Sequence, residues 1–398
     1  MKLEKIITDP AQALQYMERL VNNGSPSKFT FENMARKEYN PFFSNCFNLC
    51  YTTGVTDDFV IWGNEYPEIL NNNVMLLHPE WKNCETEFEV LESDYLVTPT
   101  SSTRTVKVLG EDIYLKLYYP GILGRISREL TEKHILSSLD VTKCLSRLVD
   151  MELVPDVFSF FPENCGKLLR KNSREIGYVI RSAIPYGKKC KYIKYMIPAF
   201  SLFSKDREND DLPLIIQILN YKNVGTAYIL DQLIFPLIDC YFMCVFNGGI
   251  QLELHSQNFL IGFDENFNVV SFIIRDLESA DKDLAIMNQL GSPILIQSKP
   301  FKCINTQDYN YKIKHSFMFD HKFGEYFLDE FLYCLVRSRG IDIEKIQQQI
   351  KEYVNMKFGE RLSDFFPEDG RWYKFARVLI DQTKSTRPYI ACLNPKYR

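Results

Sequence analysis

The sequence has few of the residues that build several common kinds of site. Only five of its 398 residues are histidines, and its 11 cysteines include no Cys-x-x-Cys pair. Cys46 and Cys50, like Cys240 and Cys244, are four positions apart, but a metal ion would need further ligands nearby. The N-terminal segment reads as an amphipathic helix without the apolar core of a signal peptide. An odd number of cysteines in this setting indicates free thiols in a reducing cytoplasm.

The chain also lacks a strong excess of charge. Its 47 basic and 51 acidic residues give a net charge of −4, which favours neither a nucleic acid nor an anionic membrane as partner. One apolar run, 227–246, is long enough to span a bilayer, but Asp231, Pro236 and Asp239 interrupt it. Charges near a bilayer centre are costly, so this run predicts a buried core helix rather than a membrane span.

What is present indicates a globular α+β protein with two or three domains. The stretch "RTVKVLGEDIYLKLYY" alternates polar and apolar residues on both sides of Gly110 and predicts a β-hairpin. Residues 124–139 predict a helix, 175–185 a strand, and most of the last 120 residues helices. The charged segment 204–211 is the best candidate for a boundary. We therefore expect an N-terminal region (1–90), a β-rich domain (91–203) and a C-terminal domain (204–398).

One polar set stands out among apolar residues near the middle of the C-terminal half. It comprises Glu253, which is expected on a strand, His255 and Asn258 in the following loop, and Asp276 at the end of a hairpin. Glu253, Asn258 and Asp276 offer the oxygen ligands that Mg²⁺ prefers. His255 and Arg275 are suited to contact a phosphate or a developing negative charge. The plainer alternative is a satisfied core histidine and a turn aspartate.

A second polar cluster lies at the start of the predicted hairpin. The segment "TSSTRT" places hydroxyl groups, among them those of Ser102 and Thr105, around Arg104, and such groups suit phosphate oxygens. Taken alone, the run also fits an ordinary Ser/Thr-rich turn. Lys116 favours the phosphate site, because it lies on the paired strand opposite the apolar face. Arg128, further along the chain, can close the site from the far side.

These segments, in this order, resemble the NRPS-independent siderophore synthetases, the IucA/IucC or aerobactin-synthetase family. The resemblance covers residues from about 75 to the C-terminus. The segments that carry it are "TSSTRT", Lys116-Leu117, Arg128, "ELHSQN" and "RD", with support from "LLHPEW", "IGYVIR", "IPAFSLF" and Asn394-Pro395. It implies the cupped-hand architecture of that family, with an antiparallel sheet at the nucleotide site, flanking helices and a largely helical C-terminal part.

The resemblance also implies an activity and its reactants. Enzymes of the family adenylate a carboxylic acid with ATP and Mg²⁺, and an amine or hydroxyl then displaces AMP to give an amide or ester. Ser102, Arg104, Thr105 and Lys116 match the family's phosphate-binding residues, and Arg128 matches the arginine near the reacting carboxylate. His255 and Gln257 match the acyl-adenylate site, and Glu253, Asn258 and Asp276 match the metal side. The resemblance leaves open whether the protein forms a homodimer.

The departures from the family pattern concern the acid substrate. The chain is shorter than typical members at its N-terminus, and the HPxHP motif associated with the carboxylate substrate is not recognisable. Glu80 also interrupts the order His-Pro-Trp after His78. The acid can therefore differ from citrate.

Two other functions are alternatives to the ligase. One is a small-molecule kinase, although Ser256 stands where its catalytic loop would carry an aspartate. The other is a family member that binds nucleotide without turnover. Of the other histidines, His134 is expected outside the site, and His315 and His321 are expected to be structural. Lys374 is a weak candidate for the acyl-acceptor site.

Overall fold

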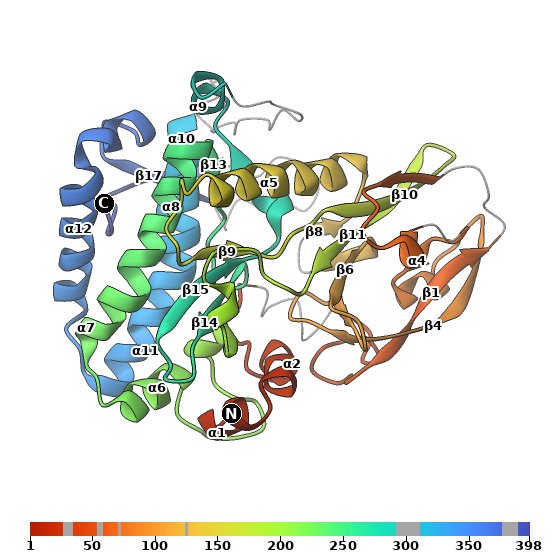
Figure 1. The fold of residues 1–398 in the computed structure, drawn as a ribbon, viewed down its shortest axis with the longest axis horizontal. Coiled ribbons are helices and arrows are strands. Elements are labelled where there is room, and N and C mark those ends of the chain that lie inside the picture. The colour runs from red at the N-terminus through yellow and green to blue at the C-terminus, as the bar shows by residue number, and fades with distance from the viewer. Residues whose placement is uncertain (27–34, 54–58, 71–72, 124–125, 292–310, 376–388) are drawn as a thin grey trace.

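The computed structural model describes residues 1–398 apart from 27–34, 54–58, 71–72, 124–125, 292–310 and 376–388. The chain has the predicted α+β fold, arranged as two lobes along the long axis of Figure 1. One lobe holds a large antiparallel sheet and the other holds most of the helices. A smaller sheet lies between them, on the side of the helical lobe (Figure 1).

The large sheet has eight strands in the order β2-β10-β11-β6-β5-β4-β1-β3, and all neighbouring strands are antiparallel. The strands are β1 (Phe47–Thr53), β2 (Phe59–Trp62), β3 (Leu76–Leu77), β4 (Glu89–Pro99), β5 (Thr105–Val108), β6 (Ile113–Leu117), β10 (Cys165–Lys171) and β11 (Arg174–Ser182). The predicted hairpin is confirmed as β5–β6, with Thr105 opposite Lys116. Gly110 adopts a φ of 86° in its turn, a conformation that favours glycine.

The smaller sheet has four strands in the order β12-β14-β15-β9, and β9 pairs parallel to β15. They are β9 (Phe158–Phe160), β12 (Tyr195–Pro198), β14 (Phe259–Phe263) and β15 (Val269–Ile274). The β14–β15 hairpin encloses a turn at 264–268, in which Asn268 donates to Asp264. The polar loop 252–258 enters β14, and the "RD" segment leaves β15. The two predicted motifs therefore meet at one end of this hairpin.

The helical lobe is built around a long apolar helix. It runs from Thr226 to Gly248 as α7 (Thr226–Tyr228), a π-helical stretch η4 (Ile229–Ile234) and α8 (Phe235–Gly248). Gly249 ends it in a left-handed conformation, which glycine adopts readily. By length and composition this helix passes as a candidate membrane span, but 67% of its most apolar window is buried inside the protein. That burial agrees with the predicted core helix.

The other elements surround this frame. The N-terminal helices are α1 (Leu3–Thr8) and α2 (Pro10–Leu20), followed later by α4 (Pro67–Leu70), η1 (Pro79–Asn83) and the β7–β8 pair (Tyr119–Leu123, Ile126–Arg128). Further along the chain come α5 (Glu132–Asp150), η2 (Cys190–Tyr192), η3 (Ala199–Leu202), α6 (Leu214–Lys222), β13 (Ile250–Gln251), η5 (Leu277–Ser279), β16 (Asp281–Lys282) and α9 (Leu284–Gln289). The C-terminal part contains α10 (Tyr311–Ser316), the π-helical η6 (Phe317–Asp329), α11 (Glu330–Arg339), α12 (Ile343–Phe365) and the β17–β18 hairpin (Arg371–Phe375, Tyr389–Leu393).

Two elements connect the lobes. Helix α5 contacts β10 and β11 of the large sheet and α8 of the helical lobe. Helix α2 contacts β4 on one side and β12 on the other, and it lies where the lobes meet (Figure 1). The charged segment 204–211 packs against the N-terminal helices: the Met1 ammonium pairs with Asp206 and Asp211, and the Arg207 amide donates to Leu20. The expected division at 90 and 203 stays a prediction.

Two local expectations are wrong. Residues 126–128 form strand β8 rather than the start of a helix, because they pair with β7, and the helix begins only after Thr131 caps it. Glu253 lies beyond a strand rather than on one, because β13 ends at Gln251. Both errors concern segment boundaries, which depend on pairing partners far along the chain.

Candidate nucleotide-binding site

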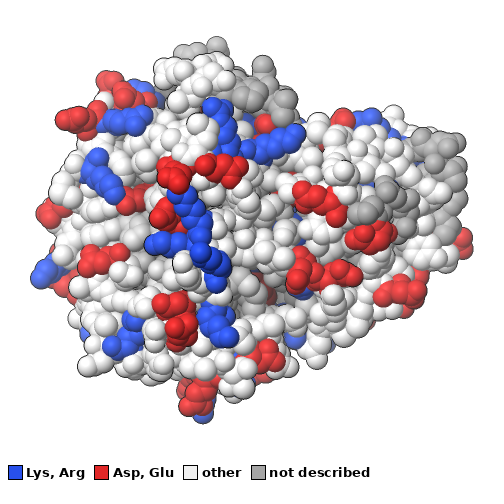
Figure 2. All heavy atoms as spheres, in the orientation of Figure 1, with Lys and Arg blue, Asp and Glu red and all other residues white. Residues whose placement is uncertain are grey.

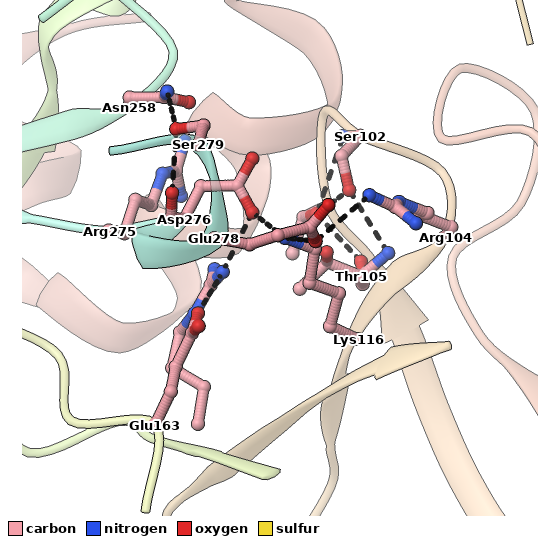
Figure 3. Close-up of polar contacts among 12 residues, drawn as sticks. Ser102, Arg104, Thr105, Lys116, Glu163, Asn258, Arg275, Asp276, Glu278 and Ser279 are labelled. Atoms are coloured by element: carbon pink, nitrogen blue, oxygen red, sulfur yellow. Dashed lines mark hydrogen bonds and ion pairs between the residues drawn. The ribbon is translucent and has the colours of Figure 1, made fainter. Parts of the chain in front are cut away.

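Lys116 lies at the centre of the candidate site. The β5–β6 pairing buries Ile113, Leu115 and Leu117 in the core of the large sheet. Alternation along the strand then directs Lys116 to the other face. Its ammonium group is 2.7 Å from a carboxylate oxygen of Glu278 and also pairs with Asp276. The lysine side chain is almost fully buried, and these two carboxylates compensate its charge (Figure 3).

The segment "TSSTRT" forms a tight turn beside Lys116. Thr103 takes a φ of 65°, and the Thr100 hydroxyl donates to the Thr105 carbonyl at 2.6 Å. The Ser102 hydroxyl accepts from the Thr105 amide at 3.0 Å and lies 3.4 Å from the Thr100 hydroxyl. Arg104 turns back and donates to the carbonyls of Arg128 and Glu129 at 3.2 and 3.3 Å. Ser102, Arg104, Thr105 and Lys116 thus lie together, as predicted, and Figure 3 shows them around one space.

The loop 253–258 brings the histidine motif to the same region. The backbone amide of Gln257 donates to Nδ1 of His255, so the proton of the neutral ring lies on Nε2. Nε2 is 3.7 Å from a carboxylate oxygen of Glu253. Burial lowers the pKa of His255 to about 4, despite the opposing charge of Glu253. His255 is therefore neutral at pH 7 and acts as a hydrogen-bond donor rather than as a cation.

Glu253 has a supporting position behind this loop. Its carboxylate pairs with Lys322 at 2.5 Å and accepts from the Asn258 amide at 3.3 Å. Burial would raise the pKa of Glu253, but Lys322 and His255 outweigh it and lower the pKa to about 2. Gln257 contacts the "TSSTRT" turn, because its side-chain NH₂ group donates to the Ser101 hydroxyl at 3.4 Å.

Asp276 joins the two lobes at the site. It follows β15 with a φ of 66°, a conformation that aspartate tolerates better than most residues. Its carboxylate pairs with Lys116 of β6 and with Arg181 of β11 at 3.2 Å. Burial opposes ionisation, but Lys116, Arg181 and Arg104 together hold the pKa of Asp276 far below its usual range. Asp276 is thus charged at any physiological pH.

Several residues of this network were not predicted. Glu278 faces Lys116 and Arg104, and Glu163 pairs with Arg181 at 2.6 Å. Glu18 of α2 accepts from the Ser101 amide at 3.1 Å and pairs with Arg275. The expectation that His134 lies outside the site is wrong, since its Nε2 is 3.9 Å from Glu278. Alternation along the strands gives a signal for Arg181. Strand β11 pairs with β6, and in that register Arg181 lies on the same face of the sheet as Lys116.

The other predicted site residues have more limited contacts. Arg128 is half-buried on β8, and its carbonyl accepts from Arg104. His315 is buried against Asp283 at 2.8 Å and His321 against Glu325 at 2.6 Å, in agreement with structural roles. Lys374 lies on β17, and its ammonium group is 4.0 Å from the carboxylate of Glu325 on η6. No contact in the described part of the chain ties Lys374 to Lys116 or His255.

The donor set can hold Mg²⁺ only in part. Among the described residues, no three His, Cys, Asp or Glu side chains are grouped as metal ligands. Asn258 directs its NH₂ group to Glu253 and Ser279, which turns its carbonyl oxygen away from them, and Asp276 is the most exposed carboxylate, at 34%. One or two protein oxygens completed by phosphate oxygens suit Mg²⁺. Asn258 and Asp276 suit this role, although Asp276 also pairs with Lys116 and Arg181, because Asp276 is 34% exposed. Glu253 is 15% exposed and pairs with Lys322, so it suits the role less well.

The fold is similar to those of three solved siderophore-biosynthesis proteins. Petrobactin biosynthesis protein AsbB from Bacillus anthracis str. Sterne has a TM-score of 0.69 and 17% identity, over 88% of this chain and 68% of that one. The ATP-bound aerobactin synthetase IucA from a hypervirulent pathotype of Klebsiella pneumoniae has a TM-score of 0.68 and 14% identity, over 98% and 79%. IucC from the same source has a TM-score of 0.64 and 13% identity, over 88% and 70%. These likenesses confirm the fold expected from the resemblance.

No protein-family model and no curated protein sequence matches the chain.

Proposed function

We propose that this chain is an ATP-dependent ligase of the NRPS-independent siderophore synthetase family. It would adenylate a carboxylic acid and join it to an amine or hydroxyl, in siderophore or related natural-product biosynthesis in the cytoplasm. The observation that carries the proposal is the convergence of Lys116, Arg104 and Asp276 from separate segments onto one buried charge network. The fold shared with AsbB, IucA and IucC supports it, as does the ATP in the IucA structure.

The chemistry requires control of negative charge. A carboxylate oxygen attacks the α-phosphorus of ATP, and pyrophosphate leaves; the amine or hydroxyl then attacks the acyl carbon, and AMP leaves. Both anionic partners repel each other unless cations lie between them. Lys116 and Arg104 come from the β5–β6 side, and Arg128 lies on β8, where its carbonyl accepts from Arg104. Mg²⁺, held by Asn258 and Asp276, would neutralise phosphate oxygens.

His255 has a distinct task in this scheme. Because it is neutral with its proton on Nε2, it can donate a hydrogen bond to an oxygen that gains charge in the transition state. Glu253 lies 3.7 Å from Nε2 of His255 and accepts a hydrogen bond from the neighbouring Asn258 amide. No covalent intermediate with the protein is needed, so the absence of a predicted nucleophile is no objection.

A small-molecule kinase is the second candidate, because Lys116, Asn258 and Asp276 would also suit phosphoryl transfer. The loop argues against it. Ser256 occupies the position where an aspartate base would be expected, and its hydroxyl is buried and donates to the Gly24 carbonyl at 2.8 Å. A residue held in this way is not free to accept a substrate proton.

The test is the nucleotide product. The protein is incubated with labelled ATP, Mg²⁺ and a panel of carboxylic acids and amines, and AMP is separated from ADP. We expect AMP and pyrophosphate that depend on one acid of the panel, and far less of both from the His255→Gln variant. ADP as the only product would replace the ligase with a kinase. ATP binding without any product across the panel would favour a non-catalytic protein.

A further inference from the structure

The proposed function assigns Lys116 and Arg104 to the triphosphate of ATP, and in this structure both cations already have an acidic partner. Glu278, on the short turn η5, directs its carboxylate at both of them. One of its oxygens lies 2.7 Å from Nζ of Lys116 and 3.7 Å from a guanidinium nitrogen of Arg104. Its other oxygen is 3.9 Å from Nε2 of His134. Figure 3 shows Glu278 between Lys116 and Arg104 on one side and the Asn258–Ser279 contact on the other.

This position is the one that an anionic ligand of Lys116 and Arg104 would take. A triphosphate cannot pair fully with these cations while Glu278 holds them, and it would meet the charges of both Glu278 and Asp276. Like charges a few ångströms apart repel each other strongly where water is largely excluded. The empty protein therefore opposes nucleotide that arrives without a compensating cation.

The Glu278 side chain is placed so that it can move away from Lys116 and Arg104 when an anion binds to them. Its side chain is 18% exposed, and it lies two residues after Asp276, on a turn of only three residues. Once the triphosphate has taken Lys116 and Arg104, the released carboxylate is at the same edge as Asp276 and the amide of Asn258. Carboxylates, an amide oxygen and phosphate oxygens together make the ligand set that Mg²⁺ prefers.

We propose that Glu278 is a nucleotide-site residue with two positions: it holds Lys116 and Arg104 in the empty protein, and with bound nucleotide it joins Asp276 on the magnesium ion. The inference rests on the proposed binding of ATP, but not on whether the product is AMP or ADP. It predicts that Mg²⁺ and Glu278 are thermodynamically coupled. Nucleotide affinity should be low without metal and should rise with metal mainly because of this carboxylate.

The experiment measures ATP affinity by calorimetry in excess Mg²⁺ and in EDTA, for the intact chain and for Glu278→Gln. In EDTA the variant should bind ATP about tenfold more tightly, because the competing charge is gone. The gain in affinity on adding Mg²⁺ should be about tenfold smaller than in the unchanged protein. Glu278→Asp, which keeps the charge, should recover part of the metal dependence.

Glu265→Gln is the matched control, since it removes the same charge from the exposed turn at the far end of the β14–β15 hairpin. It should leave all affinities unchanged. Equal tightening by Glu278→Gln with and without Mg²⁺ would overturn the metal role, and no change in either condition would overturn the whole inference. If the unchanged protein does not bind ATP at all, the proposed function fails before any variant is compared. Circular dichroism of each variant establishes that the fold is intact.

Discussion

At the scale of single residues, the site depends on charges that neutralise one another. Asp276 is held in a left-handed conformation where its carboxylate meets Lys116 and Arg181. Arg181 is in turn held by Glu163, which is fully buried. Removing one member of a buried ion pair leaves the other charge uncompensated, at a cost of about 3–5 kcal/mol. Substitutions at Lys116 or Asp276 therefore affect stability as well as activity, and they are poor probes of chemistry alone.

His255 is a better probe, because it is neutral. In His255→Gln, the side-chain carbonyl can still accept from the Gln257 amide, so the loop should keep its shape. The donor to the developing charge is displaced, and the rate of acyl-adenylate formation should fall about 100-fold. The measurement is carboxylate-dependent exchange of pyrophosphate into ATP, together with a thermal melt. A variant with nearly unchanged exchange would remove His255 from the chemistry.

The sequence predicted the residues that carry recognisable chemistry better than those that balance their charge. Lys116 and Asp276 lie in motifs with a clear order, and the structure places them in contact. Glu278 and Glu163 have no local pattern, because a buried carboxylate is explained only by cations from other segments. His134 is expected outside the site because it lies two turns beyond Arg128 on the predicted helix 124–139. With β8 in place of the first turns, His134 faces Glu278 instead.

At the scale of elements, α2 has a role that its sequence did not reveal. It reads as an ordinary amphipathic helix, yet Glu18 lies where the two lobes meet. Its carboxylate accepts from the Ser101 amide, beside the predicted phosphate turn, and pairs with Arg275, which itself donates to the Gln257 carbonyl at 2.7 Å. Helix α2 therefore sets the spacing between the phosphate turn and the histidine loop.

We predict that Glu18→Gln weakens ATP binding without touching the ligand. Arg275 would lose its buried partner, which should lower the free energy of unfolding by about 3 kcal/mol. ATP affinity should fall several-fold, because Ser101 and its neighbours are no longer held against the loop. The measurement pairs urea unfolding with calorimetric titration of ATP. Glu4→Gln, an exposed acid on α1, is the control, and an equal response of both variants would contradict the spacing role.

The element boundaries show what sequence patterns can and cannot give here. The β5–β6 and β14–β15 hairpins are local, and their turns at Gly110 and 264–268 carry clear signals. Strand β8 exists because β7 lies beside it, and β13 ends at Gln251 because its partner β16 has only two residues. Such limits follow from pairing between segments, which no short window of sequence contains.

At the scale of the whole molecule, charges of both signs are interspersed on the face in Figure 2. Inside the protein, all five histidines are at least half-buried, and burial is the largest cause that lowers the pKa of each. The values reach about 3 for His78 and about 4 for His255. The unfolded chain, with a histidine pKa near 6.5, therefore binds more protons than the folded chain below that pH.

We predict that the free energy of unfolding falls as the pH drops from about 6.5 to about 4. His78 and His255 each contribute about 1.4 kcal/mol per pH unit in this window. Burial raises the pKa of Asp320 to about 6, which opposes the trend by a similar amount from one group. Urea unfolding at about one-unit steps of pH measures the slope, and His255→Gln should reduce it. A flat or reversed slope would contradict the neutral state of the buried histidines.

The contacts that close the site also constrain when it can form. Glu18 and Arg275 are 257 positions apart, and Lys116 and Asp276 are 160 apart. Contacts at such separations form late in folding, because long loops must close first. On the ribosome, the large sheet is complete long before Asp276 is synthesised, so it emerges with the buried Lys116 still lacking its partners. Under the proposed function, ATP would therefore stabilise only a chain that extends beyond residue 276, and a nascent chain that stalls earlier would gain no protection from it.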